Sequence, residues 1–174
     1  MRSELRSLLD NPHVFTDYDL ERTVELCRSL ALSHWQHTHE PYRDVDLSNQ
    51  DMIEVLADQN FRTAYDVGFV WQFGLWRLQA VFEALIDQDF LKNVSSQGVW
   101  NKLRAMKRAG FDVLDSEEAE LRSWTKLRNA LSHRPVEPIF LTQQLDADDL
   151  REFADLLLGI LHRWRARNAE VSAS

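Results

Sequence analysis

The hydrophobic positions of the chain recur at the three- and four-residue spacing of α-helices over most of its length. This pattern predicts helices over residues 19–37, about 61–91, 99–109, 115–133 and 146–164, with short helices at 3–9 and after Ser48. No stretch alternates between apolar and polar residues as a half-buried strand would. The sequence therefore predicts an all-α fold, an antiparallel bundle of about five or six helices.

Residues with known helix-ending or helix-starting preferences mark the boundaries of the later helices. Gly110 is a suitable residue to follow the end of a helix, and Asp115 with Glu118 resembles the start of one. Pro135 stops the helix that approaches His133, and Asp146 opens the last helix.

The helix predicted over 61–91 is apolar on nearly all sides between residues 67 and 86. Such a helix is either central to the bundle or shared between its own core and a partner. Gln72, Gln79 and Glu83 are seven and four residues apart and form one narrow polar line. We expect this line to face solvent; the alternative is that Glu83 supports a functional residue on another helix.

The length and composition predict a single domain of ordinary size, residues 1–174, with no transmembrane span. The N-terminus carries acidic residues and no apolar run, so it does not read as a signal peptide. The single cysteine, Cys27, excludes an internal disulfide and suits a reducing compartment. We therefore expect a cytoplasmic protein.

Charge is unevenly distributed along the chain. The formal net charge is −8, which argues against a general nucleic-acid coat protein. Residues 1–98 hold 8 Lys and Arg against 16 Asp and Glu, whereas residues 99–174 hold 12 against 12. In that second half Lys102, Arg104, Lys107 and Arg108 cluster. They form either an ordinary solvated helix face or a local surface that attracts phosphate.

The segment WTKLRNALSHRP, residues 124–135, carries the chemistry that the sequence suggests. Its apolar residues Trp124, Leu127 and Leu131 fall on one helix face and predict a buried stripe. Arg128, Asn129, Ser132 and His133 lie off that stripe. Asn129 and His133 are four apart and share a face, while Arg128 reaches His133 only through its long side chain or because the helix ends there.

This segment resembles the HEPN superfamily, whose signature is an Arg, four to six residues, and then a His, often with an Asn directly after the Arg. Here it reads Arg128-Asn129, three residues, then His133. The resemblance implies a helical bundle that pairs as a homodimer and, in many members, a metal-independent ribonuclease of toxin or phage-defence systems. It implies a HEPN-like core over about 61–165, with residues 1–60 as an N-terminal helical extension.

The chemistry explains these residue types. Cleavage of RNA without a metal starts with attack of a 2′-OH on the adjacent phosphorus, and His133 can serve as base or acid near neutral pH. Arg128 suits the charged phosphorane because its guanidinium forks onto two oxygens, and Asn129 orients His133 or holds a phosphate oxygen. One His cannot be acid and base at once, so two copies would divide the roles. We expect no cofactor and no metal.

Further residues complete this hypothesis. Glu83 and Ser132 are expected to support the three catalytic candidates without touching RNA. The candidates for RNA binding are Lys102, Arg104, Lys107, Arg108, Lys126 and Arg134. Some family members are silenced by adenylylation of a Tyr two residues after the His, but here that position is Pro135. Silencing by that route is therefore in doubt, although an antitoxin or regulatory protein remains an expected partner.

Two other interpretations stay open. His34, His37 and His39 invite a metal site, but neither Cys nor an ordered acidic set accompanies them, so we favour a structural role. A non-catalytic HEPN-like domain that binds a nucleotide or RNA, or scaffolds a partner, is the alternative to a ribonuclease. The acidic net charge favours this alternative, and the intact Arg-Asn-His set favours the enzyme.

Overall fold

The computed structural model describes residues 14–44, 48–91, 98–133 and 145–172. These residues form α2 (Asp17–His39), the short 3₁₀-helix η1 (Glu40–Tyr42), α3 (Gln50–Asp89), α4 (Val99–Arg108), α5 (Asp115–His133) and α7 (Ala147–Ser172), with no strand among them. The prediction of an all-α fold is confirmed. The helix expected at 3–9 and the stop at Pro135 lie outside the described residues.

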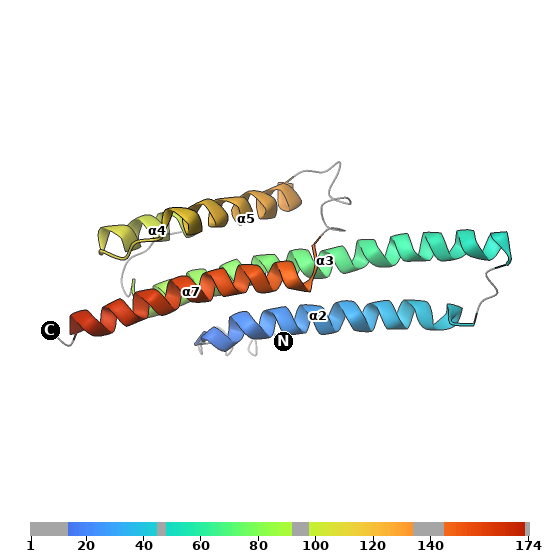
Figure 1. The fold of residues 1–174 in the computed structure, drawn as a ribbon, viewed down its shortest axis with the longest axis horizontal. Helices are drawn as coiled ribbons and strands as arrows, with labels where there is room; N and C mark the ends of the chain where they lie inside the picture. Colours follow the sequence, from blue (N-terminus) through green and yellow to red (C-terminus); the bar gives the residue numbers. More distant parts are fainter. Residues whose placement is uncertain (1–13, 45–47, 92–97, 134–144, 173–174) are drawn as a thin grey trace, which may run out of the picture.

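Helix α3 runs antiparallel to α2, α5 antiparallel to α3, and α7 antiparallel to α5 (Figure 1). As a result α3 and α7 run in the same direction, with α2 against both, while the shorter α4 and α5 form a second layer. Side-chain pairs fix this arrangement: Arg165, late in α7, contacts both Asp17 at the start of α2 and Asp89 at the end of α3. The predicted antiparallel bundle thus has α3 in its middle.

Helix α3 is one continuous helix of 40 residues, where the sequence suggested two. It begins after Asn49, whose side chain accepts a hydrogen bond from the Asp51 amide, so Asn49 and not Ser48 caps it. The polar residues 58–60 contain neither Gly nor Pro, and the helix continues through them. The expected boundary between the N-terminal extension and the HEPN-like core, at residue 60, therefore falls inside a helix. Helix α2, which belongs to the expected extension, contributes Leu20, Val24 and Cys27 to the common core.

Two helix starts also differ from expectation. Helix α2 begins at Asp17, two residues before the predicted start, and Thr16 is its N-cap. The Thr16 amide donates to Asp19 at 2.9 Å, and Asp17 and Asp19 both lie in the first turn. In α5 the carboxylate that reaches back is that of Glu117, which accepts from the Leu114 amide, and not that of Glu118. Asp146 does cap α7 as predicted, and Gly110 follows α4 with a φ of 87°. Helix α7 extends eight residues beyond the predicted end at Trp164.

The core lies where α2, α3 and α7 meet, and its closest approach is at Gly74. A Cβ atom at Gly74 would lie 2.4 Å from a Leu150 methyl of α7 and 2.9 Å from the Cys27 sulfur of α2. Both of those side chains are buried, so neither has free space to move into. None of the described helices is both long enough and apolar enough to cross a membrane.

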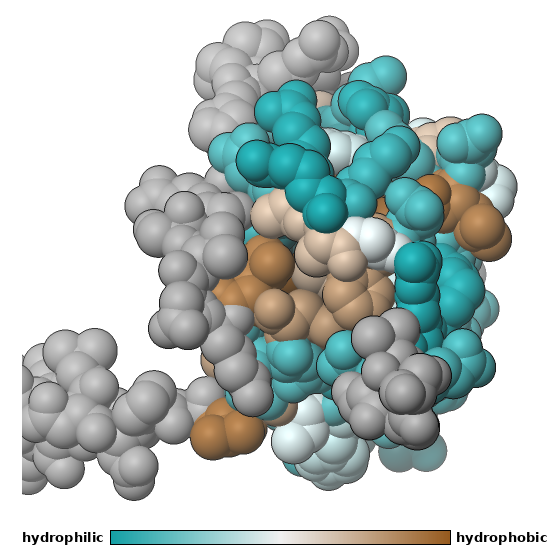
Figure 2. Space-filling model, turned by 90° about the vertical axis from the view of Figure 1, so that its left-hand side faces the viewer, coloured by the Kyte–Doolittle hydropathy of each residue, from teal (hydrophilic) through white to brown (hydrophobic). Residues whose placement is uncertain are grey.

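Aromatic rings join the elements at the end of the bundle where α3 and α7 finish. Phe90 packs on Phe111 and Trp164, with ring centroids 5.3 and 5.8 Å apart, and the Trp164 indole donates to the Asp112 carbonyl. Figure 2 looks onto this end and shows hydrophobic surface in its centre, surrounded by hydrophilic residues. The link between α4 and α5 is thereby attached to α7.

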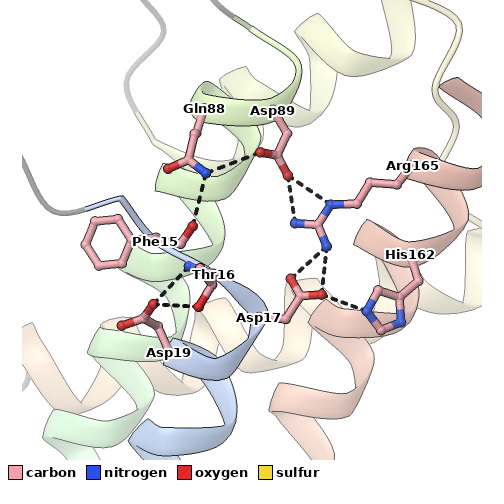
Figure 3. A network of polar contacts seen from close by, with 8 residues as sticks. All are labelled: Phe15, Thr16, Asp17, Asp19, Gln88, Asp89, His162 and Arg165. Atoms are coloured by element: carbon pink, nitrogen blue, oxygen red, sulfur yellow. Dashed lines mark hydrogen bonds and ion pairs between the residues drawn. The ribbon is translucent and has the colours of Figure 1, made fainter. Parts of the chain in front are cut away.

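A network of ion pairs connects the ends of three helices (Figure 3). The Arg165 guanidinium lies between Asp17 and Asp89, with N–O distances of 2.7 Å to each. His162 contacts the same Asp17 carboxylate at 2.8 Å. Burial alone raises the pKa of Asp17, but hydrogen bonds from Arg165 and His162 outweigh it and hold the pKa below the ordinary value of an aspartate.

Beyond the start of α7, α2 and α3 continue side by side as a two-helix arm (Figure 1). Within α3 the only buried residue before Gly68 is Thr63. Polar pairs hold this arm together: His34 contacts Asp66 at 3.2 Å, and the Thr38 and Thr63 hydroxyls lie 3.1 Å apart. The arm therefore has little of the apolar packing that stabilises the rest of the bundle.

The crowding at Gly74 predicts opposite effects of one substitution at two glycines. Gly74→Ala should lower the free energy of unfolding by about 1–3 kcal/mol, because the added methyl overpacks the core. Gly159→Ala should raise it by about 0.5–1 kcal/mol, because Gly159 is helical and a Cβ there meets nothing within 4 Å. Urea unfolding followed by circular dichroism measures both. Equal effects of the two substitutions would contradict this description of the core.

The Asp17 network predicts a loss of stability in acid. A carboxyl whose pKa is lowered by folding stabilises the fold above its unfolded-state pKa, and this contribution disappears as pH falls through the folded-state pKa. Wild type should therefore exceed Asp17→Asn by about 1–2 kcal/mol near pH 7, and the gap should shrink below about pH 4. Thermal unfolding between pH 7 and pH 2 measures it. Asp58→Asn, which removes only an exposed pair with Arg62, is the control; a gap for Asp17→Asn that does not change with pH would reject the assignment.

Candidate functional site

A groove of about 260 Å³ lies between α3, α5 and the start of α4. Its lining combines polar and apolar side chains and includes the two catalytic candidates Arg128 and Asn129. The full lining is Gln79 and Glu83 from α3, Gly98, Val99, Trp100 and Asn101 from the start of α4, and Thr125, Arg128 and Asn129 from α5.

The apolar side of α5 directs Arg128 and Asn129 toward this groove. Leu131 is buried, and Trp124 stacks on Phe153 of α7 with a centroid distance of 5.1 Å. With that face on the core, Arg128 lies at its edge and Asn129 lies on the opposite side of the helix. Arg128 is half-buried and Asn129 is exposed.

The polar line of α3 faces α5, which corrects the expectation that it faces solvent. Gln79 is only 6% exposed, and its amide donates to Glu83 at 2.8 Å. Gln72 donates to the Leu131 carbonyl at 3.1 Å, near the end of α5. The line therefore provides polar contacts for α5, and it places Glu83 in the same groove as Arg128.

Lys102 has a structural position, unlike the RNA-binding position that the sequence suggested. It is 5% exposed, and its ammonium group contacts the Asp87 carboxylate and donates to the Glu83 carbonyl at 3.2 Å. A buried ammonium with two partners is not available to a phosphate. Lys102 thus fastens α4 to α3 beside the groove, and we remove it from the RNA-binding candidates.

The other basic candidates lie on the surface where the structure describes them. Arg104, Lys107 and Arg108 of α4 are exposed, as is Lys126 of α5. Arg134 lies outside the described residues.

Helix α5 is described as far as His133, the residue to which the sequence predicted it would extend. The backbone positions of Asn129 and His133 are one helical turn apart and so share a face. The side chains of Ser132 and His133 lie outside what the structure describes. The structure therefore places Arg128, Asn129 and Glu83 around one groove and leaves the position of the imidazole as a prediction.

The histidines of α2 do not converge on a metal site. His34 contacts Asp66, whereas His39 stacks on Trp35 and contacts Asn60. Across the described parts of the chain, no group of three or more His, Cys, Asp or Glu side chains is arranged to hold a metal ion. The structural interpretation of these histidines fits their contacts with α3.

Burial raises the pKa of the Cys27 thiol to about 11, so this thiol is not a nucleophile near neutral pH.

The lining residues that were not singled out from the sequence include Trp100, Asn101 and Thr125. Trp100 and Asn101 precede Arg128 by more than 25 positions and belong to another helix. No local spacing connects them with the Arg-Asn-His segment. Only Thr125 carried a signal, because it lies three residues before Arg128 on the same helix.

Comparison with known proteins adds no relative: no family model matches this chain, and neither a curated protein nor a solved structure matches it. The resemblance to the HEPN superfamily thus rests on residues 124–135 alone.

Proposed function

We propose that this chain is a metal-independent endoribonuclease of HEPN type, acting as a toxin or phage-defence effector. The observation that carries the proposal is the groove at the end of α5, where Arg128 and Asn129 meet the polar line of α3. A half-buried guanidinium beside an open groove suits a phosphodiester better than it suits a plain surface ion pair. An antitoxin or regulatory protein is the partner that such an activity requires, by a route other than a Tyr after the histidine.

In the proposed mechanism the substrate supplies its own nucleophile. The 2′-oxygen attacks the adjacent phosphorus, the bond from phosphorus to the 5′-oxygen breaks, and a 2′,3′-cyclic phosphate and a 5′-hydroxyl result. One His133 takes the proton of the 2′-OH, and the His133 of a second copy gives a proton to the leaving oxygen. Arg128 stabilises the charge on the phosphorane, and Glu83 orients Arg128 from across the groove.

A homodimer is part of the proposal, and an exposed apolar stripe on α3 supports it. Phe69, Phe73 and Trp76 are spaced by four and three residues, and each is about half exposed. On the helix surface this stripe lies beside the polar line of Gln72 and Gln79 that faces α5. A second copy packed on the stripe would therefore lie near the candidate groove of the first.

A non-catalytic domain that binds a nucleotide or RNA, or scaffolds a partner, is the second candidate. The observation that favours it is the Glu83 carboxylate, which lines the same groove as Arg128 in a chain of net charge −8. A carboxylate there competes with phosphate for the guanidinium. Under this alternative the groove binds without cleaving.

The ribonuclease proposal predicts cleavage of RNA, but not of DNA, in excess EDTA. Arg128→Ala and His133→Ala should each lower the rate roughly 10²-fold or more, since each removes one electrostatic or proton-transfer contribution. Arg128→Lys should also fail, because an ammonium cannot fork onto two oxygens. The assay incubates purified protein with mixed RNA and identifies the 2′,3′-cyclic phosphate in the products.

The control for Arg128→Ala is Arg62→Ala, which removes an exposed arginine of the two-helix arm, outside the groove lining. It should retain most of the activity, and all variants should keep the helical circular dichroism of wild type. Activity that disappears with EDTA, or that survives in His133→Ala, would reject the mechanism. Tight RNA or nucleotide binding without cleavage would favour the second candidate.

The dimer proposal predicts that a charge on the α3 stripe separates the copies. Wild type should have the mass of a dimer by light scattering at micromolar concentration, and Phe73→Glu should have the mass of a monomer, because burying an unpaired carboxylate is costly. Leu30→Glu, at an equally exposed residue of α2, is the control and should remain dimeric. A monomeric wild type would overturn the proposal, and dissociation by Leu30→Glu alone would move the interface to α2.

A further inference from the structure

A second groove, of about 410 Å³, lies between α4 and α5. From α4 it is lined by Trp100, Leu103, Arg104 and Lys107, and from the α5 side by residues that include Glu118 and Arg122. The catalytic candidates do not line it. Its walls combine apolar side chains with three cations, which is the composition of a site for an aromatic ligand that carries negative charge.

Arg122 is held as a flat platform in this groove. Its guanidinium carbon lies 4.6 Å from the centroid of the Trp100 ring, and Glu118 accepts hydrogen bonds from its Nε at 3.2 Å and its Nη2 at 2.5 Å. The side chain is nevertheless 58% exposed. Trp100 covers one face of this guanidinium and Glu118 binds its edge. The other face is open to solvent, and such a face stacks on nucleobases.

Cations lie beside this platform without competing carboxylates on their own helix. Arg104 and Lys107 are exposed and three residues apart on α4, which contains no Asp or Glu over Val99–Arg108. The groove lining therefore contains three cationic side chains, Arg104, Lys107 and Arg122, and one carboxylate, Glu118. On a chain of net charge −8 this local excess of positive charge attracts anionic ligands, among them the phosphates of RNA.

Trp100 connects this groove to the candidate catalytic groove, because it lines both. The first groove holds Arg128 and Asn129, and the second holds Arg104, Lys107 and Arg122. A flexible strand with a phosphate at Arg128 would pass Trp100 and enter the second groove. A stiff duplex would have its bases stacked on one another and none free for the platform.

We propose that the groove between α4 and α5 binds the single-stranded RNA segment next to the cleaved phosphate. One base stacks on Arg122, and Arg104 and Lys107 hold the neighbouring phosphates. This inference rests on the proposed function in taking RNA as the substrate, but it assigns binding to residues outside the catalytic set.

The test measures binding separately from cleavage. The probe is a fluorescent single-stranded RNA of about 12 nucleotides whose 2′-hydroxyls are all methylated, so that it cannot be cleaved, and anisotropy gives its Kd with the full chain. Arg122→Ala should raise the Kd about tenfold, as expected for one lost stacking contact. Arg122→Lys should be nearly as weak, although it keeps the charge.

The phosphate contacts should be visible in how the Kd depends on salt concentration. The double variant Arg104→Ala with Lys107→Ala should reduce the slope of log Kd against log salt concentration by about 1.4, corresponding to two single-strand phosphates. Arg43→Ala with Arg62→Ala removes two exposed arginines near the far end of the arm and should leave the Kd within twofold of wild type and the slope unchanged. Circular dichroism checks that each variant is folded.

The outcomes separate this inference from the proposed function. Weaker binding by the groove variants, together with absence of cleavage in the ribonuclease assay, would keep the RNA groove and reject the enzyme. Normal RNA binding by the Arg122 and Arg104/Lys107 variants, with cleavage intact, would reject the groove and keep the enzyme. Equal losses in the control pair, equal affinity for duplex RNA, or no RNA binding at all would also overturn the inference.

Discussion

The close contact of α3 with α2 and α7 at Gly74 is the constraint on which the bundle depends. Leu150 and Cys27 occupy the space that a side chain would need, so the three helices can be this close only at a glycine. From this point toward the end of α3, apolar side chains pack continuously, and the aromatic rings and the Arg165 network complete that end. In the opposite direction α7 is absent, and α2 and α3 hold each other through polar pairs.

On another side of α3, a few polar side chains decide where the second layer sits. Gln72 holds the end of α5, and Lys102 holds α4 through the Glu83 carbonyl and Asp87. A hydrogen bond requires a defined direction and distance, whereas apolar contacts tolerate sliding. These bonds therefore fix the width of the gap between the layers, and the candidate groove is that gap.

The sequence predicted what depends on local periodicity and missed what depends on contacts between distant segments. It predicted the all-α fold, the extension of α5 as far as His133 and the cap at Asp146, because each follows from nearby residues. It did not predict that Lys102 is buried, since its partner Asp87 lies on another helix. For the same reason Trp100 could not be connected with Arg128, and the polar line of α3 could not be assigned to α5.

The two-helix arm gives the molecule regions of unequal local stability. A segment with few buried apolar contacts opens at a lower free energy than the core to which it is attached. Backbone amides of the arm will therefore exchange their hydrogens through local fraying, while those around Gly74 exchange only when the whole bundle unfolds. A protease that cuts during such fraying would shorten α2 and α3 yet leave the folded centre, with both grooves, as a resistant fragment.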